Sequence, residues 1–248
     1  MGRSSDWALE VWEQQFEEKR ADWIRRELND LEADEGHPKW DELSELYDQA
    51  YSDWEEFLED EYLWHKDQDH SAFYIEFLRA IDALNRLLSS HLDPNVSDTV
   101  IKMAYVQAVT AMETFLSDTL KTLVLGKPQY IANAATNLKE VVQQKFTLSD
   151  FVQDSKIAEK VVFEQLCKYL YHDVPKVLLL YRETLGFSLT YDLKQLIQIT
   201  KNRHDLVHRN GKGNDGKRLQ LDFTTVNSAI VEVCNFVGAV EKGLEGFR

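Results

Sequence analysis

The segment from Lys201 to Gly211, KNRHDLVHRNG, contains the side chains best suited to chemistry. It places Arg203, His204 and His208 within about one and a half helical turns. A histidine can move protons near neutral pH, and an arginine is a fixed, planar cation that binds phosphate oxygens in pairs. These residue types in this spacing therefore suit proton transfer next to a bound phosphate group.

A helix from about residue 190 to residue 208 must position these side chains, and Asn210-Gly211 is its stop signal. Its apolar arc is formed by Leu193, Leu196, Ile197, Ile199, Thr200, Leu206 and Val207. At about 100° per residue, Arg203, His204 and His208 fall within that arc. The opposite face is predicted to carry Gln195, Gln198, Asn202, Asp205 and Arg209. We therefore expect three ionisable groups to face a packed or recessed surface that supplies partners for them.

Glu113 interrupts the apolar stripe of a second predicted helix, residues 97–125. The stripe consists of Val106, Val109, Met112, Leu116 and Leu120. If the two helices pack together, this inward carboxylate is a natural partner for Arg203 and the two histidines. The alternative is a structural ion pair, since buried pairs often serve packing specificity alone.

The charge of the chain is divided between two regions. Residues 1–62 contain 21 acidic and 6 basic residues and therefore account for the whole net charge of -15. Residues 194–218 instead contain seven basic residues against two acidic ones. Such a local excess of positive charge is what a phosphate-binding surface requires. The candidates for contacts with a nucleic-acid backbone are Lys201, Asn202, Arg209, Lys212, Lys217 and Arg218.

Apolar residues recur at helical spacing along nearly the whole chain, and prolines number only four. This pattern predicts an all-α fold. We expect a linking helix within residues 69–94 and a helical domain in residues 95–248. Further helices are predicted near residues 71–92, 129–145, 149–171 and 174–185, with a last helix capped by Thr224 or Thr225.

The motif resembles that of a known family. Arg203-His204-Asp205-Leu206-Val207-His208 matches the pattern R-(polar)-x-x-x-H of HEPN-domain ribonucleases, and NRHDLVHRNG is similar to members from bacterial defence and toxin systems. Residues 104–120, AYVQAVTAMETFLSDTL, resemble the opening helix of such domains, with Glu113 at an acidic position seen in several of them. The resemblance covers residues 95–247, whereas residues 1–94 show none.

The resemblance implies an up-and-down helical bundle in residues 95–248. It also implies a metal-independent endoribonuclease in which two copies pair so that their motifs form one cleft. Arg203 and His208 would be catalytic, His204 would be the polar residue of the motif, and Glu113 would be a further site residue. RNA, such as tRNA or mRNA, would be cut by its own 2′-OH, leaving a cyclic phosphate and a 5′-hydroxyl. A homodimer without cofactors is implied, acting in antiviral defence or a toxin–antitoxin system, and an antitoxin or other regulatory partner stays open.

Residues 1–68 are predicted to form an added helical hairpin that is acidic and rich in tryptophan. Two helices, near residues 5–33 and 39–67, are separated by Glu35-Gly36-His37-Pro38, and all six tryptophans of the chain lie in this part. Its charge allows the hypothesis that the hairpin covers the basic segment as a mimic of RNA. The alternative is a solvated face that adds a dimer contact or binds a partner.

Two other motifs overlap the same segment. His204 and His208 have the spacing of the zinc motif H-E-x-x-H, but Asp replaces Glu and no third ligand is evident. The spacing from Gly211 to Gly216-Lys217 matches the start of a P-loop, but Arg218 replaces the Ser or Thr that binds magnesium. A rival of another class is a catalytically silent helical module that binds partners or senses nucleotides.

The composition predicts a cytoplasmic protein that does not associate with a membrane. No apolar run approaches the roughly 20 residues needed to cross a bilayer, and the N-terminus is charged where a signal peptide is apolar. The two cysteines, Cys167 and Cys234, lie in apolar helical pattern, which suits buried free thiols in a reducing compartment.

Overall fold

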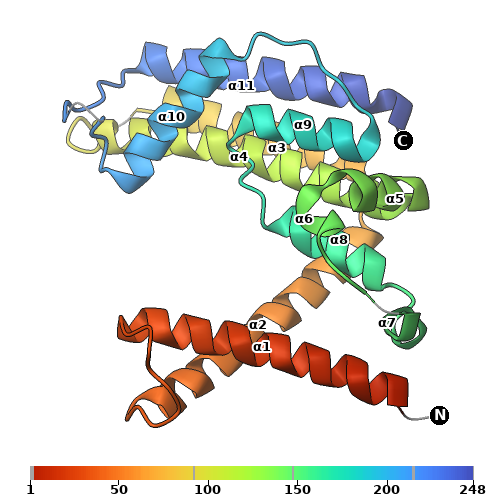
Figure 1. The fold of residues 1–248 in the computed structure, drawn as a ribbon. Helices are drawn as coiled ribbons and strands as arrows, with labels where there is room; N and C mark the ends of the chain where they lie inside the picture. Colours follow the sequence, from red (N-terminus) through yellow and green to blue (C-terminus); the bar gives the residue numbers. More distant parts are fainter. Residues whose placement is uncertain (1–2, 92, 147, 214–215, 248) are drawn as a thin grey trace. The chain divides into compact units, whose positions relative to one another are not determined.

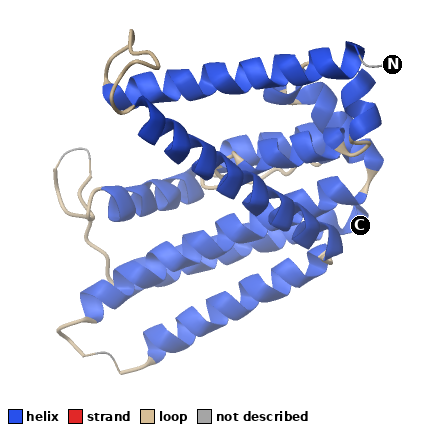
Figure 2. Ribbon diagram, turned by 90° about the horizontal axis from the view of Figure 1, so that it is seen from below, coloured by secondary structure: helices blue, strands red, loops and turns tan. Residues whose placement is uncertain are grey.

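Helices and their connections make up the described chain, which comprises residues 3–91, 93–146, 148–213 and 216–247 of a computed structural model (Figure 2). Within those ranges the β structure is one isolated bridge between Lys212 and Arg218. The predicted all-α fold is therefore confirmed. The chain divides into two units, and each is described by itself.

The first unit comprises Met1–Trp64 and Gln144–Lys160. Its helical hairpin consists of α1 (Arg3–Leu28) and most of α2 (Trp40–Asp67), which confirms the predicted break between two long helices. Ile24, Ala33 and Trp40 form a small buried cluster beside the connection. The first helix ends at Leu28, five residues earlier than predicted, and Asn29 then adopts a positive φ of 50°.

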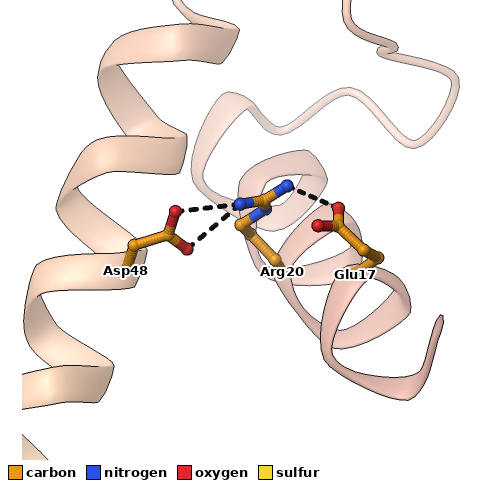
Figure 3. Close-up of polar contacts among 3 residues, drawn as sticks. All are labelled: Glu17, Arg20 and Asp48. Atoms are coloured by element: carbon orange, nitrogen blue, oxygen red, sulfur yellow. Dashed lines mark hydrogen bonds and ion pairs between the residues drawn. The ribbon is translucent and has the colours of Figure 1, made fainter. Parts of the chain in front are cut away.

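Ring contacts and surface ion pairs join α1 to α2. The centroids of the Phe16 and Tyr51 rings lie 4.9 Å apart in an edge-on arrangement. Figure 3 shows Arg20 between Glu17 of its own helix and Asp48 of α2, with Arg20 Nη1 donating to Asp48 Oδ2 over 2.9 Å. Because this ion pair lies at the surface, we assign it a small share of the stability.

The second unit comprises His65–Gln143 and Val161–Arg248. Its central helix is α4 (Ser97–Gly126), which packs against α3 (His70–Ser89), α5, α9, α10 and α11 (Phe223–Leu244). Figure 1 shows α3, α4, α9 and α11 running alongside one another, with α10 against α4 and α11. Val109, Met112, Leu116 and Leu120 of α4 are completely buried, as their apolar spacing predicts. The unit is a bundle built around α4.

The segment Phe223–Phe247, α11 with its short 3-10 turn, is the one described helix long and apolar enough to cross a membrane by length and composition. Core helices pass the same test. In this bundle Val226, Val233 and Val240 are fully buried, and α11 packs on α4 and α3. The predicted caps Thr224 and Thr225 are wrong, because Asp222 precedes the helix and its Oδ1 accepts the Thr225 backbone N–H over 2.7 Å.

The connecting helices are shorter than predicted. Residues 129–145 form α5 (Pro128–Asn137) and α6 (Lys139–Val142), because Leu138 has an extended backbone that ends the first helix. Residues 149–171 form α7 (Leu148–Gln153) and α8 (Ile157–Cys167). They are separated by a turn in which Asp154 Oδ1 accepts the Lys156 N–H over 2.8 Å. The helix α9 (Val174–Leu185) agrees with the prediction. Both cysteines, expected to be buried, are only partly buried.

Candidate active site on α10

The motif lies on α10 (Lys194–His208), which starts four residues later than predicted. Leu196 and Ile199 are buried where the helix packs on α4 and α11. The predicted stop at Asn210-Gly211 is confirmed, because both residues have positive φ and the Gly211 N–H donates to the Asp205 carbonyl over 2.9 Å. The basic loop therefore leaves the helix directly after His208.

Arg203 and Glu113 lie in contact, as expected if their helices pack. Arg203 Nη2 donates to Glu113 Oε2 over 3.2 Å, and each side chain is 16% exposed. Burial raises the pKa of the Glu113 carboxyl above its ordinary value, and the Arg203 cation opposes that shift. A fixed cation is thus held at the surface of the bundle by a carboxylate from α4.

The predicted face of the last helical turn is wrong for four residues. His204 and His208 are exposed, with ring centroids 4.7 Å apart, and Val207 is 47% exposed. Asp205, expected to face solvent, is 7% exposed and accepts a hydrogen bond from Arg209 Nη1 over 2.9 Å. Thr200 and Asp205 of α10 are buried, whereas both imidazoles are accessible to other molecules.

The predicted nucleic-acid contacts fall into separate groups. Lys201 and Arg209 line an open hollow of about 380 Å³ together with His204. Asn202 lines a different hollow, where it donates to the hydroxyl of the buried Tyr105 over 3.2 Å. The structure therefore does not bring Asn202 to the same place as Lys201.

The remaining basic candidates, Lys212, Lys217 and Arg218, are exposed on the loop after α10. Two backbone bonds tie the described parts of that loop together, from the Gly213 N–H to the Lys217 carbonyl over 2.9 Å and from the Leu219 N–H to the Gly211 carbonyl over 2.8 Å. The described parts of the loop thus present these cations from a hydrogen-bonded base.

The hollow beside α10 combines two kinds of surface. Lys201, His204 and Arg209 give it charged and imidazole groups, whereas Leu170 and Ile197 give it exposed apolar ones. Cationic groups bind phosphate, and an apolar wall can pack against a base. Such a hollow can accept a nucleotide unit of a larger nucleic acid.

His172 also lines this hollow and was missed by the sequence analysis. Its Nδ1 lies 3.7 Å from Glu113 Oε1, so it approaches the carboxylate that holds Arg203. Its position just before α9 has no spacing relation to the motif, and no sequence signal marks it. Among the described residues, no group of three or more His, Cys, Asp or Glu side chains is placed to hold a metal ion.

One family model matches this chain. The model described as RiboL-PSP-HEPN matches residues 69–246, which is more than half of the sequence. The match begins at residue 69, so it includes α3 and extends further toward the N-terminus than the resemblance placed at residues 95–247. No curated protein and no solved structure matches the chain.

Proposed function

Since the chain belongs to the RiboL-PSP-HEPN family, we propose that it is an endoribonuclease that cuts RNA without a metal ion. The observation that carries this proposal is that Arg203, which pairs with Glu113 of α4, lies on the same helix as the exposed His208. Arg203 is a fixed cation, and His208 is an imidazole that can accept and donate protons. RNA supplies the nucleophile itself.

In the proposed reaction the 2′ oxygen of a ribose attacks the adjacent phosphorus. The bond from phosphorus to the 2′ oxygen forms, and the bond to the 5′ oxygen of the next nucleotide breaks. A neutral His208 accepts the proton of the 2′-OH, and an imidazolium donates a proton to the leaving 5′ oxygen. Arg203 binds the non-bridging oxygens, whose negative charge grows in the transition state. The products are a 2′,3′-cyclic phosphate and a 5′-hydroxyl.

This scheme uses two imidazoles in opposite protonation states, and a homodimer supplies one His208 from each copy. The exposed apolar residues Ile197 and Val207 on α10 support such pairing, because they give the helix a surface that a second copy can cover. Lys201, Arg209 and the cations of the following loop would then bind the RNA backbone on either side of the cleft.

The proposal extends to cellular context. An RNase acting on tRNA or mRNA in the cytoplasm would harm the cell that makes it unless it is controlled. A role in antiviral defence or a toxin–antitoxin system, with a regulatory protein that silences cleavage, accords with that need.

The test is incubation of the purified protein with total RNA and with tRNA in excess chelator. The parent and the control His91→Ala, which changes an exposed histidine outside the site, are expected to cleave both and leave cyclic-phosphate ends. His208→Ala and Arg203→Ala are expected to leave the RNA intact. A folded, dimeric parent that cleaves nothing would favour a silent binding module, and cleavage by both variants would refute the site.

A further inference from the structure

The carboxylate of Glu113 uses only one of its two oxygens. Oε2 accepts the hydrogen bond from Arg203, whereas Oε1 is buried and has no hydrogen bond within the described chain. His172 Nδ1 lies 3.7 Å from that oxygen, just beyond hydrogen-bond distance. A buried oxygen that lacks a donor is unfavourable, so a small movement of the imidazole would be stabilising.

The backbone around His172 is fixed by its neighbours. Tyr171 is buried, and its hydroxyl donates to the Leu166 carbonyl over 3.0 Å. On the other side Val174 is completely buried at the start of α9. His172 itself is 29% exposed, so its ring has room to turn while its backbone stays in place. The segment therefore aims this imidazole at Glu113.

Arg203 also has an unused group. Its Nε is buried and makes no hydrogen bond within the described chain, although its Nη2 is occupied by Glu113. A phosphate oxygen is the acceptor that a guanidinium in this state fits best. The chain thus holds Arg203 through Nη2 alone, and the buried Nε has no acceptor among the described residues.

We propose that His172 is a positioning residue, which donates its Nδ1–H to Glu113 Oε1 and so fixes the carboxylate that orients Arg203 for phosphate. This inference rests on the proposed ribonuclease function for its effect on rate. With both carboxylate oxygens engaged, Glu113 cannot rotate, and the guanidinium plane is set before RNA arrives. Rigid support of this kind matters because small displacements of a catalytic group lower rates strongly.

The charges around His172 permit this donation near neutral pH. Glu113 faces it from α4, Asp173 is its neighbour in sequence, and α10 contributes cations and imidazoles. Burial lowers the pKa of His172, as do Arg203 and His208, whereas Asp173 raises it. The ring is therefore neutral near pH 7, and a neutral ring with its proton on Nδ1 is sufficient as a donor. The groups on α10 that face it are Lys201, Arg203, His204, Asp205, His208 and Arg209.

Three substitutions separate donation from other roles. The amide nitrogen of His172→Asn lies near the position of Nδ1, that of His172→Gln near the position of Nε2, and His172→Ala removes both donors. We expect single-turnover cleavage to fall about 10-fold in the Gln and Ala variants and to stay close to the parent in the Asn variant. Equal loss in all three would mean that the imidazole acts on the RNA, which would overturn the positioning role.

A double-mutant cycle tests whether the effect passes through Glu113. His172→Ala is expected to cause no further loss of rate when it is added to Glu113→Gln, because the carboxylate it positions is already gone. If the loss of rate in the double variant equals the product of the losses in the two single variants, the residues act independently and the proposal is overturned.

A measurement without RNA keeps this inference separate from the proposed function. In protein that contains nitrogen-15-labelled histidine, NMR is expected to show His172 as the Nδ1–H tautomer. The pKa of His172 is expected to fall in Glu113→Gln, and His172→Ala identifies its resonances. A parent that shows this coupling but cleaves no RNA would refute the ribonuclease and leave the contact standing. An Nε2–H tautomer or an unchanged His172 pKa would refute the contact itself.

Discussion

Arg203 and His208 lie on one helix, yet the chain holds them in opposite ways. Arg203 is 16% exposed and paired with Glu113 from α4, whereas His208 is exposed at the end of the helix. A phosphate-binding cation works best when it is fixed in advance, but a proton-transfer group must reach atoms of another molecule. The difference suits the proposed function, in which one chain would complete the phosphate-binding half of the site and present the other half to RNA and a second copy.

The largest expected effects come from removing each of these side chains in turn. We expect His208→Ala and Arg203→Ala to lower RNA cleavage by at least about 100-fold each. Their stabilities should differ, because Arg203→Ala leaves Glu113 buried without its partner and costs about 1–3 kcal/mol. His208→Ala should stay within about 0.5 kcal/mol of the parent. Urea unfolding measures the free energy of unfolding of each variant. Equal destabilisation by the two substitutions would contradict the difference between a paired Arg203 and an exposed His208.

A second comparison sets exposed His208 against buried His65. Burial, with the nearby Lys121 cation, lowers the pKa of His65 from 6.5 to about 3. Between these two pH values the unfolded chain binds a proton at His65 and the folded chain does not. The contribution of the neutral His65 to the free energy of unfolding is therefore full above pH 6.5 and is lost as pH falls toward 3. Relative to His65→Leu, the parent should lose up to about 1.4 kcal/mol per pH unit in that interval. Urea unfolding at several pH values measures this difference. If the free energies of unfolding of the two proteins change in parallel with pH, the lowered pKa of His65 is refuted.

The pH dependence of Glu113 should have the opposite sign. Its pKa is raised above 4.5 chiefly by burial, so the folded chain binds the carboxyl proton more tightly than the unfolded chain. The contribution of this bound proton to the free energy of unfolding is full below the ordinary pKa of a glutamate and is lost as pH rises through the raised pKa. The free energy of unfolding of the parent, measured against Glu113→Gln, should therefore fall with rising pH. An increase in the free energy of unfolding with pH would show that Arg203 lowers the pKa of Glu113 by more than burial raises it.

The smallest expected effect lies in the acidic hairpin. Asp48→Asn removes the exposed partner of Arg20 and should cost less than about 1 kcal/mol, because solvent screens that ion pair. Cleavage of RNA should not change. Thermal unfolding with a parallel cleavage assay checks both points, and a loss as large as that of Arg203→Ala would remove the distinction between surface and buried pairs.

The contact between Arg203 and Glu113 could be predicted because both residues interrupt an apolar helical pattern. The apolar periodicity of a helix predicts which of its faces is buried. Two opposite charges on the buried faces of neighbouring helices are expected to pair. The same reasoning failed at the last turn of α10, where it treated Val207 as a core residue. A sequence does not distinguish an apolar residue that packs within its own chain from one left exposed for a partner.

His172 could not be predicted, because its relation to Glu113 depends on how the turn before α9 is held. Buried Tyr171 and Val174 fix that turn through tertiary packing. The spacing of residues along the chain does not predict this packing. The breaks at Leu138 and Asp154 were also missed. Leu138 is not a helix breaker, whereas Asp154 forms a turn through its own side chain, a local signal that helical periodicity does not reveal.

The central claim is that RNA is cut by its own 2′-OH, with Arg203 and His208 supplied by this chain. The most direct measurement compares an RNA oligonucleotide with its 2′-deoxy and 2′-O-methyl counterparts in excess chelator. We predict cleavage of the RNA alone, with a 2′,3′-cyclic phosphate on the upstream product. Cleavage of the deoxy or methylated strand, or a requirement for added metal, would contradict the account.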